Sequence, residues 1–172
     1  FYGANMLCSK VRSSWLGLEA PARAALYTEL LSTLQAVVSG TLMLEAASQN
    51  RFCGAVSTAA ALSGSQSCSE FLRQAITAGA STARPLCVEL LQAFAQETLL
   101  RPNARVDALL PVISSEIPSI LEILDAHIAA GAGAAAAFKC AKVSLCTIEV
   151  CLLARARAWQ FVCCYSVINH YI

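Results

Sequence analysis

Nine cysteines in 172 residues are the side chains of this sequence that are most able to do chemistry. Four of them lie in the first half of the chain, each at or near the end of a predicted helix, where a disulfide would join neighbouring elements. The count is odd, so at least one thiol is free, bonded to another chain or bound to something else. An alternative is that several are small, buried apolar residues. The candidate disulfide cysteines are Cys8, Cys53, Cys68, Cys87, Cys163 and Cys164, and their pairing is not defined by the sequence.

The sequence supports metal binding and nucleophilic catalysis less than it supports disulfides. Cys140, Cys146 and Cys151 are separated by five and four residues, not by the Cys-x-x-Cys spacing that structural zinc sites prefer. On one helix Cys140 and Cys151 share a face while Cys146 points elsewhere. Neither histidine, His127 or His170, has a local sequence that indicates a Cys–His pair, and His127 is predicted to be a buried or interface residue. The sequence therefore predicts a protein without a cofactor or metal, and not an enzyme.

The composition predicts extensive apolar contact with a partner. Hydrophobic residues make up 57% of the chain and charged residues 13%, against about 25% charged in an average soluble domain. Because so few charged side chains leave much of a monomer's surface apolar, we expect that surface to be buried against other protein chains, another copy, an apolar ligand or a membrane surface. The net charge of +1 argues against binding to nucleic acid, which needs a basic face.

No segment predicts a membrane span, which needs roughly 18–20 apolar residues in a row. The uncharged run 52–69 contains too many serines, and the region Val143 to Ile172 is the place where contact with a membrane is most plausible. The chain begins Phe1-Tyr2-Gly3 without an initiator methionine, which suggests that a leader was removed or that the sequence is a fragment. Together with the many cysteines, this favours a secreted protein, while import into an organelle after leader removal stays open.

The spacing of apolar residues predicts an all-α fold: a helical bundle of about five to seven helices, with no sheet. We expect one helical domain over residues 1–172 with an irregular N-terminal arm over residues 1–20. Helices are predicted over 22–47, with an interruption at Gly40, over 52–62, and from a cap at Ser67 to a stop at Gly79. Residues 49–51 are predicted to form a turn and residues 63–67 a loop, with Glu70 completing a capping box.

The second half is also predicted to be helical. An amphipathic segment over 86–99 is followed by one over 106–113 that Pro111 should shorten or kink. Residues 114–118 then indicate a new helix start, and the isoleucines and leucines between 120 and 128 place that helix centrally.

Small side chains recur at helical spacing near the C-terminal end. Such a stripe lets another helix approach closely, because little side chain separates the two backbones. This packing seam, which we expect to be central or partner-facing, consists of Ala136, Cys140, Ser144, Thr147, Cys151, Ala154 and Ala158.

These features predict packing more clearly than chemistry. The first function hypothesis is a noncatalytic structural or assembly subunit, whose apolar helical surface is buried by self-association or against partner chains. The alternative is a secreted helical carrier that holds a lipid or other apolar ligand between amphipathic helices.

Overall fold

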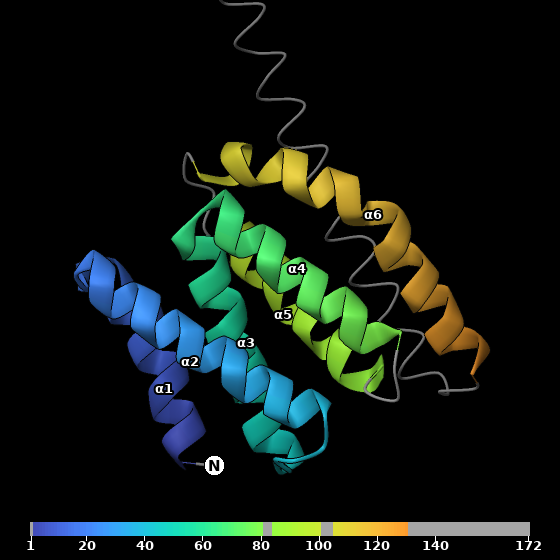
Figure 1. Cartoon of the computed structure of the whole chain (residues 1–172), viewed down its shortest axis with the longest axis horizontal. Helices are drawn as coiled ribbons and strands as arrows, with labels where there is room; N and C mark the ends of the chain where they lie inside the picture. The colour runs from blue at the N-terminus through green and yellow to red at the C-terminus, as the bar shows by residue number, and fades with distance from the viewer. Residues whose placement is uncertain (1, 81–83, 101–104, 131–172) are drawn as a thin grey trace, which may run out of the picture.

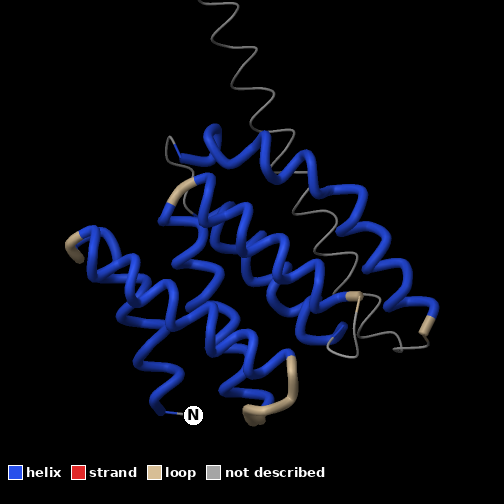
Figure 2. Tube along the Cα trace, viewed as in Figure 1, coloured by secondary structure: helices blue, strands red, loops and turns tan. Residues whose placement is uncertain are grey.

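The computed structural model describes residues 2–80, 84–100 and 105–130, and within them it confirms an all-α bundle without strands (Figures 1 and 2). Six α-helices and one short 3-10 helix follow one another along the described chain. Their bounds are α1 Tyr2–Ser14, η1 Trp15–Gly17, α2 Ala20–Val38, α3 Ala46–Ser63, α4 Ser65–Gly79, α5 Arg84–Leu100 and α6 Arg105–Ala129.

Helix α3 is the centre of the described bundle, because it packs against α1, α2, α4 and α5. All residues from Phe52 to Leu62 are buried, so every face of this segment contacts protein. Most of them are glycine, alanine, serine or threonine, which lets the surrounding helices come close. At Gly54 an added Cβ atom would lie 3.3 Å from the Cys8 sulfur, closer than an ordinary van der Waals contact, so α1 packs tightly on α3 at this glycine.

The other helices are tied together around α3 by specific contacts. The Ser57 hydroxyl donates a hydrogen bond to the Leu90 carbonyl at 3.2 Å and so links α3 to α5. The rings of Phe71 and Phe94, with centroids 5.3 Å apart, join α4 to α5. Helix α6 lies along the outer side of α4 in Figure 1, with which it makes its most extensive contact.

The N-terminal prediction is wrong, because the expected irregular arm over residues 1–20 is mostly α1 followed by η1. Cys8, Val11 and Trp15 follow helical spacing and are 3%, 2% and 1% exposed, so this face is fixed by packing against α3. The predicted turn at 49–51 is also wrong, since these residues lie inside α3. That residues 1–172 form one domain stays a prediction.

Two glycines mark the helix ends more sharply than expected. The sequence predicts a helix reaching residue 47, but α2 ends at Val38 and Gly40 adopts a φ of 76°, a left-handed conformation that glycine accepts readily. Gly64, with a φ of 104°, is the single residue that separates α3 from α4. The predicted loop over 63–67 is therefore wrong, and so is the predicted cap at Ser67, which lies inside α4. Glu70 forms no capping box and instead accepts a hydrogen bond from the Gln74 amide at 2.9 Å. The predicted stop at Gly79 is confirmed.

The two helical segments expected between 106 and 128 form one helix, α6, with Pro111 and Pro118 inside it. Both prolines are exposed, while Leu109, Ile113 and Ile120 are buried on the opposite side. An interior proline costs about 3 kcal/mol of helix stability, so packing of this apolar face outweighs the local penalty. Figure 1 shows that α6 curves along α4, at the edge of the described bundle and not at its centre.

Candidate functional site

The four described candidate disulfide cysteines form no disulfide with one another in the structure, so the bridges expected among them are absent. Cys8, Cys53, Cys68 and Cys87 are buried within helices, where they fill space as small apolar side chains. Burial raises the pKa of the Cys68 thiol to about 12 and raises the pKa of Cys53 as well. Both thiols are therefore neutral and poorly nucleophilic at physiological pH.

The remaining predicted site residues lie outside the described part of the chain. This holds for Cys163, Cys164, His170 and the whole packing seam from Ala136 to Ala158. His127 is described and is 9% exposed on α6, which agrees with the buried position that the sequence indicates. Among the described residues, no cluster of three or more His, Cys, Asp or Glu side chains is arranged to hold a metal ion.

A polar cleft of about 350 Å³ opens between α1, α3 and α5 and was not predicted. Its charged groups are Arg12 from α1, Arg51 from α3 and Glu97 from α5. Arg12 and Glu97 form an ion pair in which the Glu97 side chain is 3% exposed and that of Arg12 45% exposed. Burial raises the pKa of the neighbouring Cys8 thiol, an effect that the positive charge of Arg12 partly opposes.

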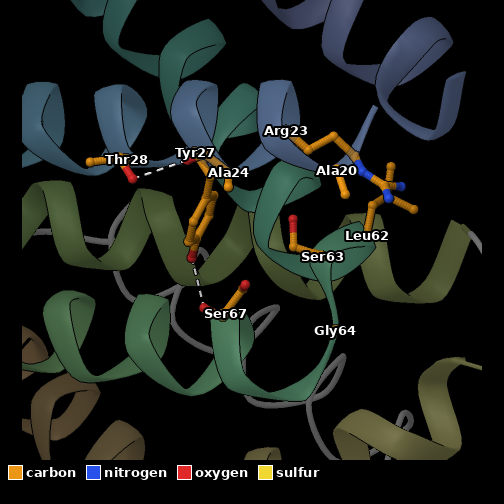
Figure 3. Close-up of a pocket in the computed structure, with 9 residues that line it drawn as sticks. All are labelled: Ala20, Arg23, Ala24, Tyr27, Thr28, Leu62, Ser63, Gly64 and Ser67. Carbon is orange, nitrogen blue, oxygen red and sulfur yellow. Dashed lines mark hydrogen bonds between the residues drawn. The ribbon is translucent and has the colours of Figure 1, made fainter. Parts of the chain in front are cut away.

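A second cleft, of about 590 Å³, lies between α2 and the junction of α3 with α4 (Figure 3). The Tyr27 side chain points from α2 toward α4, where its hydroxyl donates a hydrogen bond to the Ser67 carbonyl at 2.7 Å. Burial raises the pKa of Tyr27, so the phenol remains protonated. The Arg23 guanidinium lies at the far side of the lining from Tyr27 in Figure 3, so the two groups do not converge on one point. The tyrosine therefore fastens α2 to α4.

A third cleft, of about 380 Å³, runs farther along α2 and α4. Leu34 and Val38 form its apolar wall, and Glu70 and Arg73 line the other side as an ion pair on α4. By contrast, the apolar space between α4, α5 and α6 measures only about 10 Å³, the size of a single water site.

Large apolar side chains project into solvent from two outer helices. On α1, Tyr2 and Met6 are 78% and 48% exposed and lie one turn apart; we call this pair the α1 face. On α6, Leu121 and Ile128 are 40% and 45% exposed and lie two turns apart; we call this pair the α6 face. Both faces expose side chains that usually contribute to interface cores.

The helices described by the structure include none whose length and apolar character would let it cross a lipid bilayer. Comparison of the chain with family models, with curated proteins and with solved structures finds no match.

Proposed function

We propose that this protein is a noncatalytic structural subunit that self-associates through apolar helical surface. The observation that carries this proposal is the exposure of Tyr2 and Met6 on the α1 face and of Leu121 and Ile128 on the α6 face. Removing apolar surface from water yields about 25 cal/mol per Å², so contact between such faces stabilises an assembly. Two faces on different helices allow each copy to contact more than one neighbour.

The charge balance supports another copy of the chain as the partner. Twelve basic and eleven acidic residues leave a net charge of +1, so copies do not repel one another at long range. A net charge near zero also promotes association in general.

The clefts give less support to the alternative, a secreted carrier of a lipid or other apolar ligand. Ligand pockets of carriers are mostly apolar and measure about 300–1,000 Å³. The apolar space between α4, α5 and α6 is about 10 Å³, and each of the larger clefts between described helices has charged side chains in its wall. None of these four spaces is both large and free of charged side chains, so they support a carrier less than the exposed faces support self-association.

Replacing exposed apolar pairs with serine tests the proposal. We expect the full chain to sediment with a mass above its monomer mass of 18.1 kDa. The double variants Tyr2→Ser/Met6→Ser and Leu121→Ser/Ile128→Ser should each weaken association by about tenfold or more, because each removes two apolar contacts from a subunit interface. Sedimentation velocity over a range of concentrations measures this effect.

The matched control is Ala25→Ser/Glu29→Ser, two exposed positions one turn apart on α2, which should leave the mass unchanged. A monomer at every concentration, or an oligomer that neither apolar pair affects, would refute self-association through these faces. A monomer carrying lipid in native mass spectrometry would instead support the carrier.

A further inference from the structure

The polar cleft between α1, α3 and α5 is lined by two arginines and one glutamate. Arg51 is exposed on α3 and forms no ion pair with any residue that the structure describes. Arg12 faces the same cleft and is held against the buried Glu97 carboxylate. The Arg12 side chain is nevertheless 45% exposed, so part of it remains accessible from solvent.

We propose that this cleft binds a small oxyanion, a molecule that carries a carboxylate or a phosphate group, through Arg51 and the exposed side of Arg12. The two guanidinium groups outnumber the one carboxylate, and that carboxylate is 3% exposed and already paired. An anion that enters the cleft is therefore expected to contact the guanidinium donors and not the buried Glu97 carboxylate. Arginine suits this role because its planar guanidinium group presents several donors that match two oxygens of a carboxylate or phosphate.

The remaining lining fits a small polar molecule. The side chains of Asn50 on α3 and Gln96 on α5 line the cleft and carry both donors and acceptors. A volume of about 350 Å³ is at the lower end of the range for small-molecule sites, so a small organic acid or phosphate fits better than a large cofactor. This proposal does not depend on self-association, because the α1 and α6 faces contribute no lining residue.

Calorimetric titration of the full chain with inorganic phosphate, at an ionic strength matched with sodium chloride, tests the proposal. We expect saturable binding to the unmodified chain and about tenfold weaker binding to Arg51→Gln, because a charge-assisted hydrogen bond is lost. Lys10→Gln removes the same charge from an exposed position on α1 that does not line the cleft, and should bind phosphate as the unmodified chain does.

A parallel titration with succinate distinguishes the two ligand classes: tighter binding of phosphate favours phosphorylated molecules, and tighter binding of succinate favours carboxylates. Circular dichroism checks the fold of each variant, and Arg51→Lys provides a charged replacement without the planar fork if Arg51→Gln does not fold. Arg51→Lys should bind more weakly than the unmodified chain. The absence of saturable binding of both anions, or equal binding by the Arg51 variants and the unmodified chain, would overturn the proposal.

Discussion

Replacing Ala59 with leucine is expected to lower the free energy of unfolding by about 3 kcal/mol, the upper part of the usual range for overpacking a core. Ala59 is 0% exposed in the C-terminal half of α3, and its neighbours along the helix are buried on every side. A larger side chain there must push away a surrounding helix or adopt a strained rotamer, because protein interiors are close-packed. Urea unfolding followed by circular dichroism measures the change.

The matched control is Ala25→Leu, the same substitution at an exposed position of helix α2. This variant should change the free energy of unfolding by no more than about 0.5 kcal/mol. If Ala59→Leu were as stable as Ala25→Leu, α3 would not be enclosed as the structure describes.

Gly79→Val is expected to cost about 2 kcal/mol of stability, because this glycine lies where three helices meet. A Cβ atom added to Gly79 would lie 2.8 Å from the Ile123 Cγ2 atom of α6 and 2.9 Å from the Cys87 sulfur of α5. Real Cβ contacts are essentially never this short, so the Ile123 and Cys87 side chains, or the helices that carry them, must shift. Thermal and urea unfolding should both show the loss.

Gly3→Val is the control for the effect that replacing glycine with valine has on the helix backbone itself, apart from packing. Gly3 is exposed on α1, and no heavy atom lies within 4 Å of its added Cβ. Valine and glycine differ by only a few tenths of a kcal/mol in helix propensity, so this change should be nearly neutral. Equal losses in the two variants would show that the contacts of Gly79 do not matter.

Local sequence patterns predicted the helices whose apolar faces repeat over many residues. The regular leucines of α2 and α5 indicated both helices, although Gly40 ended α2 earlier than expected. Helix α1 was missed because only two of its residues, Cys8 and Val11, are buried, and two buried positions do not show a helical repeat. The first turns of α3 were missed for a related reason. Asn50 is typical of a turn, but the segment is helical and the amide of the neighbouring Gln49 donates a hydrogen bond to the Glu89 carboxylate of α5 at 3.0 Å. Tertiary contacts between distant segments decided both cases.

The packing seam predicted from small residues and the small-residue helix that the structure describes lie in different parts of the chain. Small residues were expected to organise the bundle between Ala136 and Ala158, which lies outside the described residues, so that seam stays a prediction. In the described part, the Ala-rich segment Phe52 to Leu62 has this role, and the sequence indicated only a short helix there. The polar cleft could not be predicted, because Arg12 and Glu97 are 85 positions apart and no local motif connects them.

Amide hydrogen exchange of the full chain tests most directly whether α3 is the centre of the fold. Amides from Phe52 to Leu62 are expected to exchange only through global unfolding, so the free energy of their exchange should equal the free energy of unfolding measured with urea. Amides on the exposed side of α1 should exchange through smaller, local openings. Exchange of the Phe52 to Leu62 segment as fast as that of α1 would contradict a bundle built around a buried small-residue helix.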